Sequence, residues 1–228
     1  MSGFSYKNLL LQIIHGAVII GTLAFLFYDV LNQNLIDYLK ANESILLALF
    51  LFSSFIIGVI IDFVADILES FAIRFFIKPP IFYLLTTERH LGITLAHNEY
   101  ILFKLCQIAS KFDKDKKDVS CYYKEFKTGK NKKIINYILQ VAKNKAFRVC
   151  KDYQKEQIDS FFVLYIFSRN ISLSLLISAV VVFIYSNISI AIILMAIVLF
   201  TVTSSYRFYL YYSRILLGVT VTKENSVR

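Results

Sequence analysis

Three carboxylates stand at helical spacing where a strongly apolar run of the chain ends. Asp62, Asp66 and Glu69 are separated by four and three residues, and Gly58 precedes Asp62 by four. Residues three and four positions apart share a face of an α-helix, so the three acids are expected to form one stripe. Carboxylates next to a membrane are costly unless they are paired, solvated or functional, and the stripe is therefore the first candidate site.

Two interpretations of this stripe stay open. In the first, Asp62, Asp66 and Glu69 form the inner mouth of a cation or proton pathway, or bind the basic surface of a partner. In the second, they pair with basic residues and thereby fix the packing of helices. The basic residues considered for such pairs are Arg74, Arg169 and Arg207, of which Arg169 and Arg207 also flank other apolar runs.

A second polar group lies inside the first apolar run. Gln12, His15 and Thr22 occupy one face of a helix at separations of three and seven residues. Gln12 and His15 are candidates for the deeper part of a pore, and hydrogen bonding between packed helices is the alternative use of such residues. Hydroxyl residues of the later apolar runs have the same two uses: Ser172, Ser174, Ser178, Ser189 and Thr201.

The segment from Lys111 to Lys133 is rich in lysine, with Tyr122, Tyr123 and Phe126 interleaved. It could bind the phosphates of a nucleic acid or nucleotide while its aromatic rings stack on bases. It could equally lie against anionic lipid headgroups, or form a solvated helix face. The residues proposed to contact a partner, lipid or phosphate are Lys114, Lys116, Lys117, Lys130, Lys132 and Lys133.

Catalytic and metal-binding patterns are missing from the sequence. The three cysteines have no zinc-ligand spacing, and no HExxH or Gly-x-Ser-x-Gly pattern occurs. His90 and His97 are seven residues apart and are expected to share a helix face, where His97 and Glu99 could form an acid/base pair acting on lipid. We nevertheless expect no enzyme, no catalytic residues, no metal and no cofactor.

Composition places the chain in the membrane. Of 228 residues, 57% are hydrophobic, and the mean hydropathy is +0.60. The apolar residues cluster into runs that are long enough to cross a hydrocarbon core about 30 Å thick. We predict an all-α integral membrane protein with four transmembrane helices in two hairpins, and the expected spans are 9–28, 44–67, 171–185 and 188–206. The helical pattern of the second run continues to Lys78, where Pro79-Pro80 must end it.

Charge predicts how the chain is oriented. Residues 74–169 hold 19 Lys and Arg against nine Asp and Glu, whereas the connection after the first span is acidic. Lys and Arg accumulate on the cytoplasmic side of membrane proteins. We therefore expect a bacterial inner-membrane protein with both termini and the long basic segment in the cytosol. The Tyr- and Arg-rich sequence Tyr206–Arg214 is typical of the headgroup level.

The basic segment is expected to fold as a helical domain. A helical stripe of apolar residues runs from Leu91 to Phe112 and another from Ile135 to Val149, with Gly129 as a turn between them. A further helix from about Lys151 could run without a break into the third span. The predicted organisation is a first transmembrane hairpin (1–73), a cytosolic helical domain (74–170), and a second hairpin with a cytosolic tail (171–228).

The layout resembles that of small four-helix bacterial membrane proteins found with anti-phage defence systems, the KwaA family of the Kiwa system being one candidate. The resemblance is carried by Gly58 with the Asp62/Asp66 helix end, by Phe167-Ser168-Arg169-Asn170 at the start of the third span, and by the Tyr- and Arg-rich end of the fourth. It implies a membrane-embedded oligomer that senses or executes an attack on the membrane, often with a soluble cytosolic partner.

Two functions from different classes are therefore expected. One is an oligomeric sensor or pore-type effector, because four helices are too few to enclose a pathway and several copies are needed. The other is a passive anchor or immunity-type protein that recruits a soluble partner. The expected partners are the lipid bilayer, further copies of the chain and a cytosolic protein, with nucleic acid or nucleotide as an open alternative.

Overall fold

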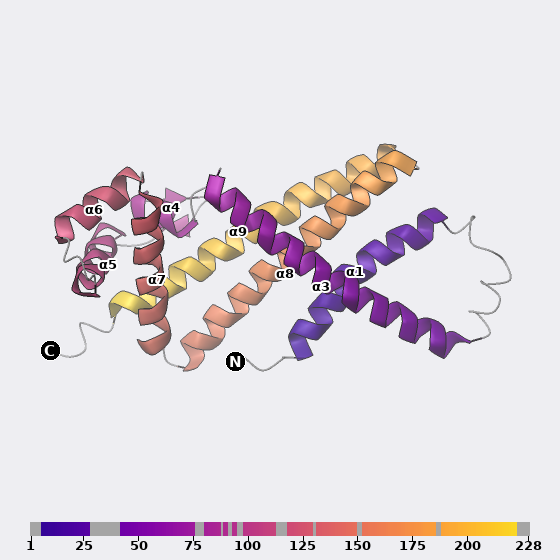
Figure 1. The fold of residues 1–228 in the computed structure, drawn as a ribbon, viewed down its shortest axis with the longest axis horizontal. Helices are drawn as coiled ribbons and strands as arrows, with labels where there is room; N and C mark the ends of the chain where they lie inside the picture. Colours follow the sequence, from indigo (N-terminus) through magenta and orange to yellow (C-terminus); the bar gives the residue numbers. More distant parts are fainter. Residues whose placement is uncertain are drawn as a thin grey trace. The chain divides into compact units, whose positions relative to one another are not determined.

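The computed structural model describes residues 6–27, 42–75, 80–87, 89–90, 93–94, 98–112, 118–129, 131–149, 152–185 and 188–222. This part of the chain is helical apart from one short ladder of two antiparallel strands (Figure 1). Its elements are α1 (Tyr6–Phe27), α3 (Glu43–Phe75), α4 (Pro80–Thr86), β1 (Arg89–His90), β2 (Ile93–Thr94), α5 (Asn98–Phe112), α6 (Val119–Thr128), α7 (Lys132–Val149), α8 (Asp152–Tyr185) and α9 (Ile188–Thr222).

Four helices are long and apolar enough to cross a membrane, as expected. The apolar stretches are Leu9–Phe27, Glu43–Ala72, Tyr153–Tyr185 and Ile188–Val219, and the last three are longer than the spans inferred from sequence. α8 begins at Asp152 and continues to Tyr185 because no proline or glycine interrupts it. α3, at 33 residues and 1.5 Å per residue, is about 50 Å long and exceeds the thickness of a hydrocarbon core.

The chain divides into two compact units. We call Met1–Phe75 with Ile166–Ser205 the membrane unit, and Phe76–Tyr165 with Tyr206–Arg228 the helical unit. α8 and α9 each contribute residues to both. The sequence had grouped everything after residue 171 as a hairpin with a tail, whereas in the structure the second part of α9 packs with the helical unit.

Two glycines let α1 and α3 cross in close contact. A Cβ atom on Gly16 would lie 1.8 Å from the carbonyl oxygen of Ser54, and one on Gly58 would lie 1.9 Å from that of Gln12. The earlier position of α1, Gln12, thus meets the later position of α3, Gly58, and Gly16 of α1 meets Ser54 of α3. Figure 1 shows the two helices crossing at a wide angle. Small residues spaced by four permit such approach of backbones in membrane proteins.

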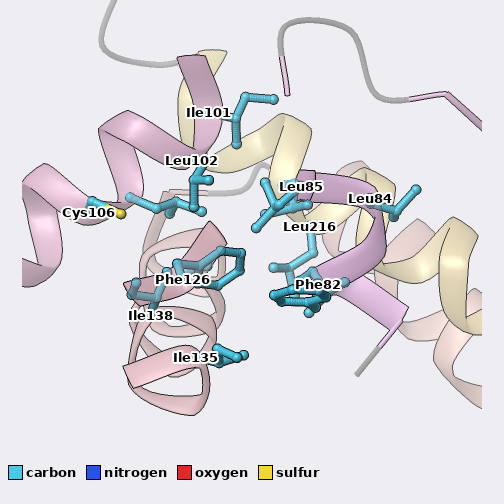
Figure 2. Close-up of a cluster of buried hydrophobic side chains, with 14 of the residues drawn as sticks. Phe82, Leu84, Leu85, Ile101, Leu102, Cys106, Phe126, Ile135, Ile138 and Leu216 are labelled. Atoms are coloured by element: carbon cyan, nitrogen blue, oxygen red, sulfur yellow. The ribbon is translucent and has the colours of Figure 1, made fainter. Parts of the chain in front are cut away.

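The helical unit has a conventional apolar core. Phe126 is fully buried and lies 5.3 Å from Phe82, ring centre to ring centre. Figure 2 shows how Leu85, Leu102 and Leu216 approach them from α4, α5 and α9. The core therefore draws on the later part of α9, which explains why that helix continues beyond residue 206. Further core residues are Leu84, Leu105, Ala109, Ile135, Ile138, Ala142, Ala146, Ile158, Leu210 and Leu217.

The start of α5 corrects one expectation. A helix was predicted from Leu91, but α5 begins only at Asn98. Oδ1 of Asn98 accepts a hydrogen bond from the backbone N–H of Glu99 at 2.8 Å. The preceding segment forms the β1–β2 ladder, with Arg89 opposite Thr94. His90 lies in β1 and not on a helix, so the shared His90/His97 helix face is wrong; His97 itself lies outside the described residues.

Gly129 forms the predicted turn, and it ends α6, a helix that was not predicted from the sequence. Its φ of 62° is left-handed, a conformation that costs glycine little, and its N–H bonds to the carbonyl of Phe126. At the other end, Asp118 caps the helix by accepting a hydrogen bond from the N–H of Val119 at 2.7 Å. The lysine-rich segment therefore contains a helix with a defined start and stop.

Candidate functional site

The acidic stripe of α3 meets a single arginine of α8. One terminal nitrogen of Arg169 donates to Oδ1 of Asp62 at 2.9 Å, and the other donates to Oδ1 of Asp66 at 2.5 Å and to Oε2 of Glu69 at 2.7 Å. The planar guanidinium, with its fixed fork of donors, can hold several carboxylate oxygens at once. All three stripe residues thus lie around Arg169, within the membrane unit.

Asn170 completes the network. Its side-chain nitrogen donates to Oδ1 of Asp62 at 2.7 Å, and its oxygen accepts a bond from Nε of Arg169 at 3.0 Å. Asn170 is 1% exposed and the Arg169 side chain 14%, so the centre of the network is shielded from its surroundings. No role was predicted for the Asn170 side chain, although it directly follows the expected arginine; its position at the start of an apolar span was the available signal.

Exposure differs among the three acids. The side chain of Asp66 is 66% exposed, compared with 35% for Asp62 and 25% for Glu69. Exposed ion pairs contribute about 0–1 kcal/mol, whereas breaking a shielded pair leaves a charge without compensation. The bonds of Arg169 to Asp62 and Glu69 therefore hold α3 to α8, and the Asp66 carboxylate is the most exposed of the three.

The described network carries an excess of negative charge. Three carboxylates surround one guanidinium, so with all four groups ionised the formal charge is −2. Such a cluster can do two things chemically: it can fix two helices to each other, and it can attract cations from the adjoining water. These are the two interpretations that the sequence left open, and the geometry places both in the same residues.

His15 and Gln12 lie at the α1/α3 crossing. His15 is 1% exposed, and its ring lies 5.2 Å from that of Phe167 on α8. Neither ring nitrogen of His15 makes a hydrogen bond of acceptable geometry within the described residues, and neither does Oε1 of Gln12. The buried hydroxyl of Ser54, which was not a candidate from sequence, likewise makes no hydrogen bond of acceptable geometry within the described residues.

Several other hydroxyl residues of the spans have hydrogen-bond partners. Thr22 donates to the carbonyl of Val18 at 2.8 Å and lies 3.0 Å from the hydroxyl of Ser178, which links α1 to α8. Ser172 and Ser174 donate to carbonyls four residues earlier in their own helix, at 2.6 and 3.1 Å. These contacts serve packing.

Four of the six lysines proposed to contact a partner, lipid or phosphate lie outside the described residues: Lys114, Lys116, Lys117 and Lys130. Lys132 begins α7 and Lys133 is exposed on it.

Arg207 on α9 is exposed, and among the described residues no ion pair of its side chain is found. Its expected helix-packing pair stays a prediction.

The helical unit instead presents an aromatic and basic surface on α5 and α6. Tyr122 and Phe126 are buried in the core, so they are not available for stacking on bases in the folded unit. Exposed in their place are Tyr100 and Phe103, at 46% and 48%, and the ring of Phe103 meets that of Tyr123 edge-on at 6.4 Å. The sequence analysis missed these residues, which lie opposite the apolar stripe of α5.

Lysines lie over the rings of this surface. Nζ of Lys104 is 5.7 Å from the ring centre of Tyr100, and Nζ of Lys127 is 5.1 Å from that of Tyr123. Lys127 also pairs with Glu99 at 2.6 Å, and the hydrogen bonds that its ammonium group makes with the side chains of Glu99 and Tyr123 raise the pKa of Lys127. We call Tyr100, Phe103, Lys104, Tyr123 and Lys127 the aromatic–lysine patch. Because the Glu99 carboxylate pairs with Lys127, this lysine competes with His97 for Glu99 in the expected acid/base pair.

Within the described ranges, no cluster of three or more His, Cys, Asp or Glu side chains has the geometry to hold a metal ion. Comparison with protein families, with curated proteins and with solved structures finds no match to this chain.

Proposed function

We propose that the chain is an oligomeric inner-membrane sensor or pore-type effector subunit, of the kind found in bacterial defence systems. Its helical unit would lie in the cytosol and bind a partner or ligand that controls the membrane unit. The observation that carries this proposal is the Arg169 network, in which three carboxylates of α3 bind one guanidinium of α8. One carboxylate would be enough for a purely structural clamp, and the excess of acidic over basic groups in the described part of this network favours a cation-attracting mouth.

Several copies would form the pathway. Four spans make a thin bundle, and the membrane unit exposes large apolar side chains such as Phe63, Phe183 and Phe200, at 65%, 61% and 73%. Lipid covers such surfaces as well as protein does, so they allow assembly without specifying it. With several copies, the networks would form a ring of carboxylates, which is how cation-selective mouths are built.

Control would reach the network through α8. The helix has residues in both units, and Arg169 is the fourth residue of its membrane part. A ligand acts on such a system only by binding one arrangement of the protein better than another. We propose that a partner on the helical unit changes how Arg169 is shared among Asp62, Asp66 and Glu69, and so alters the charge at the mouth.

The test measures membrane potential and dye uptake in cells that express the full chain from a tight promoter, alone and with its genomic neighbours. Depolarisation that Asp62→Asn or Asp66→Asn changes severalfold at equal membrane levels supports the proposal. Glu43→Gln is the matched control, because Glu43 is an exposed carboxylate at the other end of α3. An intact potential under every condition contradicts it, as does a Glu43→Gln effect equal to that of Asp62→Asn.

A passive anchor is the second candidate, and the aromatic–lysine patch favours it. Exposed aromatic residues are enriched in protein interfaces, and the lysines suit an acidic soluble partner. In this function the Arg169 network only holds the helices together. Replacing the membrane unit by unrelated spans would then preserve function, whereas Lys104→Glu with Lys127→Glu would release the partner. Loss of function on replacing the spans contradicts the anchor.

A further inference from the structure

Among the described residues, five fully buried polar side-chain atoms make no hydrogen bond of acceptable geometry. One is the hydroxyl of Ser213 in the helical unit, and the other four belong to residues at or next to the α1/α3 crossing: Oε1 of Gln12, both ring nitrogens of His15, and the hydroxyl of Ser54. Gln12 and Ser54 take part in the crossing itself, since their carbonyl groups lie against Gly58 and Gly16, and His15 adjoins Gly16. All three residues belong to stretches apolar enough to span a membrane.

Such atoms need hydrogen-bond partners, because an unsatisfied polar group in an apolar environment is costly. A neighbouring copy of the chain cannot supply them, since the atoms have no exposed surface. The partner must therefore be small enough to enter the crossing. Water meets this requirement and makes two to four hydrogen bonds in sites of this kind.

The crossing also adjoins the Arg169 network. His15 lies against Phe167, which is one helical turn before Asn170, and Asn170 binds Asp62. The backbone of Phe167 lies within reach of one ring nitrogen of His15, and the charged groups that act on the ring are Asp62 from α3 and Arg169 from α8. A buried imidazole with a carboxylate within reach is the usual arrangement of a proton relay in a membrane protein.

We propose that the α1/α3 crossing is a hydrated proton-binding site, in which Gln12, His15 and Ser54 hold water and His15 exchanges protons with that water beside Asp62. A hydronium ion transfers its proton to a free ring nitrogen of His15 and becomes water, and the reverse step restores neutral imidazole. The ionised Asp62 carboxylate stabilises the imidazolium formed. This inference deepens the proposed function by naming the proton as the species that passes, and in that respect rests on it.

The first test asks whether His15 contacts water and needs no transport activity. The chain has three histidines, so His90→Gln with His97→Gln leaves His15 as the only ¹⁵N-histidine signal in the full chain in lipid. In solid-state NMR, we expect magnetisation to pass from water to the His15 ring as fast as it passes to other hydrated side chains. Ser54→Ala, which adds no volume, should reduce the transfer at least twofold. A ring that receives none overturns the proposal.

The second test measures proton flux into liposomes that contain the full chain and an internal pH dye, driven by a potassium gradient with valinomycin. His15→Phe keeps an aromatic ring beside Phe167 and should lower the flux at least tenfold. Thr22→Val is the matched control, since Thr22 is a polar residue of α1 with its own partners. It should change the flux less than twofold.

The outcomes separate this inference from the proposed function. One outcome is a flux of potassium or dye that depends on Asp62 and a proton flux that His15→Phe does not change. This outcome contradicts the proton site but agrees with the pore. A hydrated His15 in a chain that carries no ion supports the hydrated site and contradicts the pore. Where His15→Phe lowers the amount of folded chain, the Ser54→Ala NMR result decides.

Discussion

The two units of this chain are built in opposite ways. Among the described residues, eight of the nine buried polar side chains lie in the membrane unit, and Ser213 alone lies in the helical unit. Conversely, all the largest fully buried side chains except His15 belong to the helical unit. Phe126 and Leu102 are buried there, while Phe63 and Phe200 of the membrane unit are exposed.

This contrast matches the packing expected in two different solvents. Water expels apolar side chains, so a unit in water is stabilised by burying them, as the helical unit does. Lipid is as apolar as leucine, so helices in a membrane are held by close packing and polar contacts. Gly16 and Gly58 supply the close approach in the membrane unit, and Arg169, Asn170 and Thr22 supply the polar contacts.

The largest expected effect is on the core of the helical unit. Phe126→Ala should destabilise that unit by about 3–5 kcal/mol, because it removes a fully buried ring and leaves a cavity. Hydrogen exchange of α4–α7 amides in the full chain measures this. Phe103→Ala, on the exposed side of α5, should cost under about 1 kcal/mol. Equal effects of the two substitutions would contradict the placement of Phe126 in the core and of Phe103 on the surface of this unit.

A single methyl group should have a smaller but clear effect in the membrane unit. Gly58→Ala puts a Cβ 1.9 Å from the Gln12 carbonyl oxygen, and separating the helices should cost about 1–3 kcal/mol. Gly21→Ala is the matched control on α1, since a Cβ there meets nothing within 4 Å. Unfolding of the full chain in mixed detergent compares them. Equal stability of both variants would contradict the close crossing.

The last effect is absent at neutral pH and appears only at alkaline pH. Burial raises the pKa of the Cys106 thiol from 9.0 to about 12, so above pH 9 the unfolded chain loses this proton before the folded one does. The folded state then binds more protons, and the free energy of unfolding of the helical unit falls as pH rises from about 9 towards 12. The difference between the unfolding free energies of the wild type and of Cys106→Ala, measured across this pH range, isolates the dependence.

The two cysteines should also differ in reactivity. The half-buried Cys121 should react with iodoacetamide faster than the buried Cys106. The reverse order would contradict the burial of Cys106 in the core.

Much of the architecture was predictable from sequence. Apolar runs of sufficient length define spanning helices whatever they pack against, which is why four were found. The stripe of Asp62, Asp66 and Glu69 followed from helical periodicity alone. The β1–β2 ladder was not predictable in this way, because Leu91 and Leu95 fit a helical stripe equally well, and the choice between strand and helix depends on neighbouring segments.

What the sequence determined by itself is therefore local: which segments are helical, which are apolar enough for lipid, and which residues share a face. Those properties depend on the chemistry of residues a few positions apart. Only the tertiary structure decided that Arg169 is shared by three carboxylates, that Gly16 meets Ser54, and that the end of α9 completes the core around Phe126. Each of these contacts joins segments distant in the chain, and their formation depends on how complementary surfaces fit together.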